Sequence, residues 1–342
     1  MKAIVKRNRK KGFVLSDSPV PPLKPGQVLI KTVYAGICGT DVHIYRWDEW
    51  AQKRIHPPVI GGHEFMGVIE KVSDDVTYLE PGARVSAEGH ITCGHCKFCR
   101  TGQGHICQNV KIIGVDIDGA FAEYIAMPAE NVWPVPNSIP DRFAAVFDPL
   151  GNAMHTVMEV PISGRSVLIT GCGAIGLFAV SIALAAGASR VIVSEPNTFK
   201  RRLAKKAGDI DVIDPAEQKL PEAVRDLTDG LGPEVVLEMS GNPGALTDAF
   251  KAVQNGGHVV ILGIPAGTVC VNWAEDIIFK GITINAVNGR RMYDTWYQCQ
   301  NFLKNRNINI SHILTHEFPA EDFEKGFDVI ENGEAAKVLL SF

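Results

Sequence analysis

The feature that most constrains this chain is a short apolar run that breaks into glycines, SVLITGCGAIG at residues 166–176. The apolar residues predict a buried strand, and Gly171, Gly173 and Gly176 predict a tight turn at the N-terminus of a helix. Free backbone N–H groups and the helix dipole at such a turn favour a pyrophosphate group. The pattern therefore predicts a dinucleotide site.

The residues after these glycines support that interpretation. Residues 177–186 are almost wholly apolar, which suits a helix buried against a sheet, and Gly187 stands where this helix is expected to end. A second apolar run, 191–193, predicts a strand with Glu195 at its end. Glu195 lies 24 residues after Gly171, where a carboxylate binds the adenosine ribose hydroxyls of NAD and repels the 2′-phosphate of NADP. The alternative is a solvated residue that merely follows a strand.

The hydrophobic pattern divides the chain near residue 150. Residues 1–150 contain short alternating strands separated by Pro and Gly, which predicts a mostly β domain. Residues 151–290 alternate between strand and helix patterns, which predicts a doubly wound parallel sheet. Residues 291–342 predict an aromatic helix and a final strand, 338–340, that returns to the first domain. The six strands expected in the parallel sheet are 167–169, 191–193, 211–213, 235–237, 259–262 and 282–284.

Length and charge restrict the class of protein. With 342 residues, 46% of them hydrophobic, the chain can form two globular cores. A net charge of −4 with interspersed signs offers no surface for a polyanion, and no apolar run reaches the length of a membrane span. Nucleic acid and membrane are therefore not expected partners. The basic N-terminus lacks the apolar core of a signal peptide, and residues 3–5 predict an edge strand, so a cytoplasmic protein is expected.

Four of the eight cysteines lie within a single segment of 15 residues. Their number and spacing are typical of a closed tetrahedral zinc site, which would stabilise a lobe that has little core of its own. The competing interpretation is a nucleic-acid-binding zinc ribbon, which the acidic chain disfavours. The four predicted ligands are Cys93, Cys96, Cys99 and Cys107.

A second set of metal-binding residue types is more widely spaced. Cys38 occurs in GICGTDVH, and His63 and Glu64 occur in GGHEFMG. A thiolate, an imidazole and a carboxylate leave one zinc position open, as in sites that polarise a substrate oxygen. Each residue alone is more often part of a core, but together, next to glycines that allow close backbone approach, they indicate a metal site.

These motifs, in this order, resemble the zinc-dependent medium-chain alcohol dehydrogenases over the whole chain. Within that family, the segments CGTDVHIYRWDEW, EGHITCGHCKFCR, FDPLGNAMHT and GRRMYDTWY are similar to members that oxidise L-threonine. The resemblance implies a GroES-like, mostly β catalytic domain and a Rossmann domain, NAD, and one catalytic and one structural zinc per subunit. It also implies a cytoplasmic homotetramer that oxidises L-threonine to 2-amino-3-oxobutanoate, with hydride transfer to nicotinamide.

The resemblance also implies roles for single residues. Cys38, His63 and Glu64 match the catalytic zinc ligands, and the four clustered cysteines match the structural ones. Thr40 and His43 match a proton relay, for which the alternative is simple packing. The acidic position near the metal is Asp148. The cofactor positions are Gly171, Gly173, Ile175, Gly176, Glu195, Lys200, Leu262, Gly263, Ile264, Val287 and Asn288, with Lys200 standing where the family commonly has Arg.

Three alternatives concern substrate and activity. A polyol or 2,3-butanediol dehydrogenase of the same family would share the zinc ligands and the nucleotide domain. A non-catalytic dinucleotide-binding relative would not need every zinc ligand, and all are present here. The sequence does not decide which residues would bind the charged groups of an amino-acid substrate. The five candidates are Asp41, Asp48, Glu49, Arg290 and Arg291.

Overall fold

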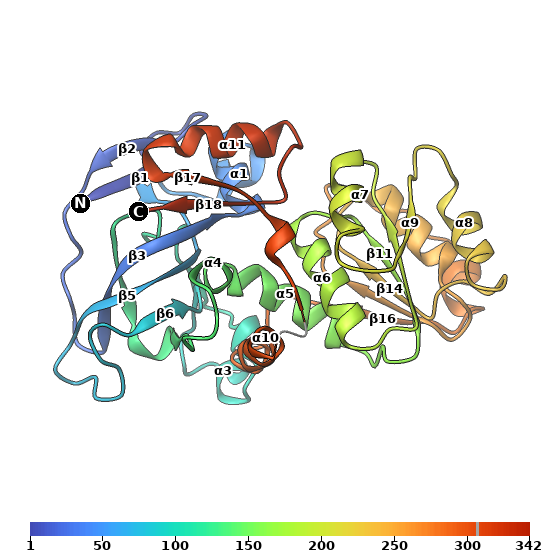
Figure 1. Cartoon of the computed structure of the whole chain (residues 1–342), viewed down its shortest axis with the longest axis horizontal. Helices are drawn as coiled ribbons and strands as arrows, with labels where there is room; N and C mark the ends of the chain where they lie inside the picture. The colour runs from blue at the N-terminus through green and yellow to red at the C-terminus, as the bar shows by residue number, and fades with distance from the viewer. Residues whose placement is uncertain (306–307) are drawn as a thin grey trace. The chain divides into compact units, whose positions relative to one another are not determined.

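The computed structural model describes residues 1–305 and 308–342 and divides into two compact units, shown in Figure 1. The first contains Met1–Asp148 and Leu314–Phe342, and the second contains Pro149–Ile313. Before Leu314, the segment Ser311–Ile313 packs on helix α6 (Ala174–Ala185) of the second unit. The extent of each domain remains a prediction.

The first unit is mostly β, as the short alternating strands predicted, and its strands pair antiparallel except for Leu314–Pro319 and Lys337–Ser341, which pair in parallel. The long strand β3 (Gln27–Ile37) pairs with β5, β9 and β18, so the C-terminal strand does return to this unit. The large sheet has the order β10 (Val132–Pro134), β6 (Arg84–Ala87), β5 (Glu64–Val72), β3, β18 (Lys337–Ser341) and β17 (Leu314–Pro319), with β9 (Tyr124–Pro128) also on β3.

A smaller sheet corrects one expectation. Strand β1 (Lys2–Lys6) is not an edge strand, because it lies between β2 (Val14–Asp17) and β4 (Val59–Ile60). These neighbours are short and carry no clear alternation, so the sequence pattern did not indicate them. In the apolar core of the unit, the rings of Tyr45 and Phe327 stack with centroids 4.3 Å apart.

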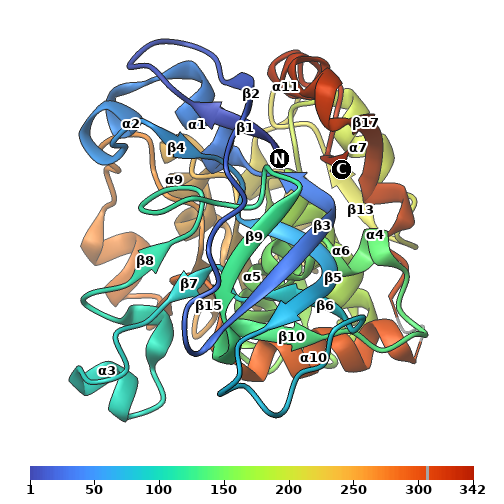
Figure 2. The ribbon, with the colours of Figure 1, turned by 90° about the vertical axis from the view of Figure 1, so that its left-hand side faces the viewer.

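The helices of the first unit are short, and two of them matter most for the site. Helix α1 follows β3 directly, and α2 follows α1 after a two-residue turn. Strands β7 (His90–Ile91) and β8 (Lys111–Ile112) pair with each other, and α3 lies in the segment between them (Figure 2). The helices are α1 (Gly39–Arg46), α2 (Glu49–Arg54), α3 (Lys97–Arg100), α4 (Asp141–Ala144) and α11 (Phe323–Glu331), while α5 (Phe147–Met158) runs into the second unit.

The second unit is the predicted doubly wound domain. Its six strands are all parallel, and each of the six predicted strands is confirmed to within a few residues. Most side chains of the four inner strands are buried on both faces, as expected for a parallel sheet covered by helices. The order is β13 (Asp211–Ile213), β12 (Arg190–Ser194), β11 (Ser166–Thr170), β14 (Val235–Glu238), β15 (His258–Ile261) and β16 (Thr283–Ala286).

Helices connect these parallel strands. Helix α6 starts directly after the glycine turn and buries most of its residues, and Gly187 follows it with φ +85°, a left-handed conformation that glycine adopts without strain. No helix of the described residues is long and apolar enough to cross a membrane. The other helices are α7 (Thr198–Ala204), α8 (Leu220–Asp226), α9 (Pro243–Ala252), a π-helix at Trp273–Ile278, and α10 (Asp294–Lys304).

Candidate active site

Cys38, His63 and Glu64 come together in the first unit. Cys38 is the residue between the end of β3 and the start of α1, and Glu64 is the first residue of β5, which pairs with β3. One ligand atom from each of the three side chains lies within 4.8 Å of the others. Because β3 and β5 are neighbours, residues 25 positions apart in sequence supply one compact set of metal donors.

Glycines make this approach possible, as the sequence pattern suggested. A Cβ atom on Gly36 of β3 would lie 2.3 Å from Glu64 Oε2, so only glycine leaves room for that carboxylate. Gly62 has φ +84°, and a Cβ there would lie 2.2 Å from the ring of Phe121. Both positions therefore depend on the absence of a side chain.

Acidic groups surround His63. The buried carboxylate of Asp41 accepts hydrogen bonds from the backbone N–H groups of Cys38 (2.8 Å) and Gly62 (3.3 Å), and its Oδ1 lies 3.7 Å from His63 Nδ1. Burial acts to lower the pKa of His63, but Asp41 and Cys38 outweigh it and raise that pKa well above its usual value. The site therefore favours a positive charge at this point. A thiolate, an imidazole and a carboxylate in such surroundings fit Zn²⁺.

Lys337, which the sequence analysis did not identify, binds one of these donors. Its fully buried ammonium donates to both oxygens of Glu64, at 2.9 and 2.7 Å, and to the carbonyl oxygen of Ile37 at 3.0 Å. Burial acts to lower the pKa of Lys337, but Glu64 outweighs it and raises that pKa. The carboxylate shares its charge with this ammonium, so Glu64 is expected to be the weakest of the three metal donors.

The two predicted relay residues lie on α1, directly after the cysteine. Thr40 Oγ1 lies 3.9 Å from Cys38 Sγ. His43 is one helical turn further along, and its side chain is 55% exposed. A hydroxyl beside the metal donors and an imidazole open to solvent are the two kinds of group that a proton relay needs.

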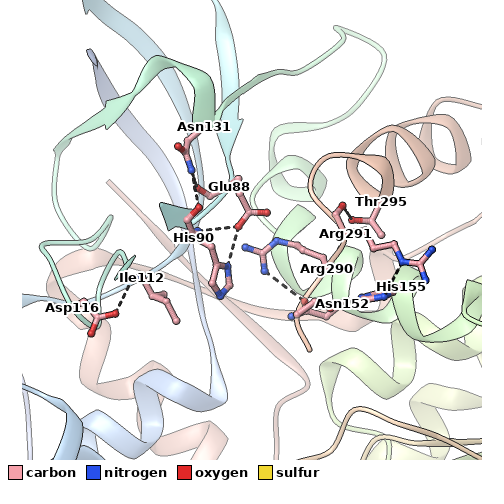
Figure 3. Close-up of polar contacts among 11 residues, drawn as sticks. Glu88, His90, Ile112, Asp116, Asn131, Asn152, His155, Arg290, Arg291 and Thr295 are labelled. Atoms are coloured by element: carbon pink, nitrogen blue, oxygen red, sulfur yellow. Dashed lines mark hydrogen bonds and ion pairs between the residues drawn. The ribbon is translucent and has the colours of Figure 1, made fainter. Parts of the chain in front are cut away.

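Asp148 lies in a separate polar cluster of the first unit. The Asp148 carboxylate lies near Glu88 and His90, and ligand atoms of these three residues are within 4.8 Å of one another. It does not belong to the set of Cys38, His63 and Glu64. Asn131 Nδ2 donates to the carbonyl oxygens of Glu88 (2.8 Å) and His90 (3.0 Å), and Glu88 Oε1 accepts from the His90 N–H at 2.9 Å (Figure 3). Asp148 still contributes to the negative charge around His63. Its position is consistent with an acid near the metal that is not a ligand.

The candidate groups for substrate charges have different surroundings. Asp41 is buried beside His63, and Glu49 is highly exposed and faces Lys53 at 3.8 Å. In the second unit, Arg290 is buried and contacts Asn152, and Arg291 donates to His155 at 3.2 Å (Figure 3). Arg291 also donates to Glu159 at 2.7 Å. Asp48 contacts His43.

The four clustered cysteines form a second compact set, in the segment between β7 and β8. Their sulfur atoms lie 3.5 to 4.0 Å apart in the pairs Cys96–Cys99, Cys93–Cys107, Cys96–Cys107 and Cys93–Cys99. The backbone N–H of His95 lowers the pKa of Cys93 to about 6, and that of Cys99 lowers the pKa of Cys96. Four sulfurs in this arrangement, two of them disposed to ionise, fit a closed tetrahedral Zn²⁺ site.

The predicted dinucleotide site lies at the carboxyl ends of the parallel strands. Gly171 has φ +86°, and a Cβ on Gly176 would lie 2.0 Å from the Gly171 carbonyl oxygen, so the turn requires both glycines. Glu195 Oε2 accepts a hydrogen bond from the Cys172 N–H at 2.6 Å, which fixes this carboxylate beside the turn. A cavity of about 510 Å³ lies here, and its lining includes Gly171, Gly173, Glu195 and Lys200.

The other predicted cofactor residues lie along the same edge of the sheet. Leu262, Gly263 and Ile264 follow β15, and Val287 and Asn288 follow β16. Ile175 is the second residue of α6. In an open α/β sheet, ligands bind outside the carboxyl ends of the strands, so this placement fits their predicted role.

The cavity also shows residues that the sequence analysis missed. Ser240, Asn242 and Asp248 line it, and the Asn242 side chain caps α9 by accepting from the N–H groups of Gly244 and Ala245. The signal was a strand followed by SGNPG, which is a second turn that begins a helix.

Comparisons with known proteins agree with this geometry. The profile of the alcohol dehydrogenase GroES-like domain matches residues 24–137, and that of the zinc-binding dehydrogenase matches residues 174–305. The chain belongs to the zinc-dependent medium-chain alcohol dehydrogenases.

Among members of this family, proteins called L-threonine 3-dehydrogenase are similar over nearly full length. The one from Bacillus licheniformis is 44% identical over 99% of this chain and 98% of its own. The one from Pyrococcus abyssi is 47% identical over the same shares. A zinc-binding dehydrogenase from Sinorhizobium meliloti, solved with NADP, is 29% identical with a TM-score of 0.91, covering 100% of this chain and 99% of that chain. The predicted fold class, with GroES-like and Rossmann domains, is confirmed.

Proposed function

We propose that this chain oxidises L-threonine at its secondary alcohol to 2-amino-3-oxobutanoate, with NAD as hydride acceptor and zinc as the catalytic metal. The observation that carries the proposal is the compact set of Cys38, His63 and Glu64 among acidic groups, with Thr40 next to it. The names of the full-length relatives support threonine as the substrate.

Cys38, His63 and Glu64 would hold the catalytic zinc, and the four clustered cysteines would hold the structural one. When bound in the first site, zinc acts as a Lewis acid that polarises the alcohol oxygen. Asp41 lies 3.7 Å from His63 Nδ1 and acts on it by charge, and Lys337 holds the Glu64 carboxylate in place. Asp148 and its neighbours add negative charge without belonging to the ligand set.

Thr40 and His43 move the proton that the alcohol loses. The Thr40 hydroxyl accepts this proton and at the same time donates its own hydroxyl proton onward. The His43 imidazole is the terminal base. Because the His43 side chain is 55% exposed, it can release the proton to solvent. The exchange of His43→Asn should lower turnover about 100-fold while the zinc content stays unchanged.

The Rossmann domain would hold NAD, which accepts the hydride at its nicotinamide ring. The glycine turn offers backbone N–H groups to the pyrophosphate, and Glu195 accepts from the ribose hydroxyls. The Cys172 N–H holds the Glu195 carboxylate beside the turn by a hydrogen bond. The carboxylate would repel the 2′-phosphate of NADP. We therefore expect a clear preference for NAD over NADP, and equal kcat/KM with both would contradict the assignment of Glu195.

A substrate panel tests this function. The zinc-loaded protein with NAD should form NADH with L-threonine at a kcat/KM at least about tenfold above that with sorbitol or 2,3-butanediol. A higher value with either diol would favour the polyol or butanediol alternative. No NADH with any alcohol, at full zinc content, would favour the non-catalytic alternative.

The proposal includes domains, assembly and location. We assign residues 1–150 with 291–342 to the catalytic domain and 151–290 to the NAD domain.

Strand β16 is the outer strand of the parallel sheet, and Trp273, Ile278 and Phe279 are at least 65% exposed in the same unit. An unpaired edge with exposed apolar residues favours association, here as a homotetramer. All eight cysteines are free, which favours the cytoplasm. Native mass measurement tests the assembly.

A further inference from the structure

The proposed terminal base, His43, is held by two neighbouring side chains. Its Nδ1 makes a hydrogen bond with Asp48 Oδ2, and its ring meets Trp50 edge-on with centroids 6.1 Å apart. An imidazole that is 55% exposed would otherwise rotate freely. The two contacts therefore fix the orientation of a side chain that the helix alone leaves mobile.

The backbone between α1 and α2 brings Asp48 to His43. Trp47 ends α1 in a left-handed conformation with φ 59°, and its N–H donates to the carbonyl oxygen of His43 at 3.0 Å. This reversal makes Asp48 the N-cap of α2, where its Oδ1 accepts from the Ala51 N–H at 3.0 Å. One carboxylate oxygen thus caps the helix, and the other is left for His43.

The charge of Asp48 decides which nitrogen of His43 carries a proton. Partial burial acts to raise the pKa of Asp48, but hydrogen bonds from the Ala51 N–H and from His43 outweigh it and lower that pKa. At neutral pH the carboxylate can only accept, so Nδ1 of a neutral His43 must be the N–H. Nε2 is then the nitrogen with a free lone pair.

The other charged groups around these two helices face elsewhere. Arg46 donates to Glu331 at 2.6 Å, and Asp41 lies beside His63. Glu49 and Lys53 face each other in exposed positions at 3.8 Å, and Arg54 donates to Asp116 at 2.7 Å. Among the residues that the structure describes, the ion pair recorded for His43 is the one with Asp48.

We propose that Asp48 is a positioning residue of the proton relay, which holds His43 as the Nδ1–H tautomer and leaves Nε2 to take the proton. The inference rests on the proposed function, in which His43 is the terminal base. The Thr40 oxygen takes the proton of the alcohol while the Thr40 hydroxyl proton forms a new N–H bond at His43 Nε2. The Nδ1–H bond stays intact, and the imidazolium later releases a proton to solvent. Asp48 itself is never protonated. This role removes Asp48 from the candidates for binding the substrate amine.

The exchange of Asp48→Asn separates this role from helix capping. Asparagine caps a helix about as well as aspartate, so α2 should keep its start, and only the charge is lost. We expect kcat with threonine to fall about tenfold with KM within about twofold of the wild type. The control is Asp116→Asn, which removes an equal charge at the other end of α2 and should change neither quantity.

A spectroscopic measurement on the substrate-free protein tests the same inference without turnover. In ¹⁵N-edited spectra above pH 8, His43 should be the Nδ1–H tautomer in the wild type and in Asp116→Asn, and a mixture of tautomers in Asp48→Asn. Assignment of the signal comes from its loss in His43→Asn. This result would support the positioning role even if the chain oxidised a different alcohol, which keeps the inference distinct from the substrate proposal.

Three results would overturn the inference. The first is a wild-type His43 that is mainly the Nε2–H tautomer. The second is an Asp48→Asn variant with higher KM for threonine but unchanged kcat and tautomer, which would make Asp48 a substrate-binding group. In a His43→Asn background, Asp48→Asn should cause no further loss of kcat, and a further tenfold loss would equally contradict the role.

Discussion

The two sets of metal-binding residues in the first unit are built in opposite ways. The four cysteines come from one segment between β7 and β8, at half-buried to buried positions, and offer four equivalent sulfurs. Cys38, His63 and Glu64 lie at the adjoining ends of two paired strands, offer three different donors, and are surrounded by buried charges. The first arrangement fills all four positions of a tetrahedral ion and suits stability, whereas the second leaves one position for a substrate.

We call Cys38, His63 and Glu64 the open set and the four clustered cysteines the closed set. The largest effect is expected from a substitution in the open set. In Cys38→Ser, the softest donor is replaced by a poor zinc ligand, so turnover with threonine should fall more than about 1,000-fold. The melting temperature should stay within a few degrees of the wild type, since backbone hydrogen bonds pair β3 with β5 and do not involve the Cys38 side chain. Turnover and thermal unfolding of the same preparation check this, and a folded variant with turnover near the wild type would remove Cys38 from the site.

Breaking the closed set should reverse this pattern. In Cys96→Ser, loss of one thiolate weakens a site on which the β7–β8 lobe depends, at a cost of about 3 kcal/mol, or about 6–12 °C in melting temperature. Turnover below that temperature should fall far less than in Cys38→Ser. An unchanged melting temperature with lost turnover would indicate that the cysteine set serves catalysis.

A smaller effect is expected from the buried acid beside His63. Asp41→Asn keeps the size of the side chain but removes the charge that favours a cation, so zinc affinity of the open set should fall about 10–100-fold. Competition with a fluorescent zinc chelator measures this, and the matched variant Asp118→Asn, an acid of the same unit that also accepts a backbone N–H, should leave the affinity unchanged. Equal affinities in both variants would contradict the role given to Asp41.

A chelator should distinguish the two sets without any mutation. Dipicolinate can enter the open position of the first set, but it finds no free position on the closed one, so activity should be lost before the melting temperature falls. Activity and thermal unfolding are followed over the same time course. Simultaneous loss of activity and of thermal stability would mean that the chelator reaches the metal in both sets equally well.

Local patterns explain what could be predicted from the sequence. The glycine turn, the six parallel strands and the cysteine cluster each depend on neighbours along the chain, and each was recognised there. Lys337 was missed because its partner, Glu64, is 273 residues away in sequence and nothing before a C-terminal apolar strand indicates a buried ion pair. The contact of Asp48 with His43 depends on the left-handed Trp47, a conformation that no sequence rule predicts for tryptophan. The interior position of β1 was missed because its partners are short strands.

Metal analysis of the wild type beside Cys38→Ser and Cys96→Ser tests the central claim most directly, namely that one set holds a catalytic ion and the other a structural ion. The account predicts about two zinc ions per chain in the wild type and about one in each variant, with turnover abolished only in Cys38→Ser. Two ions retained in Cys38→Ser, or one ion in a fully active wild type, would contradict it.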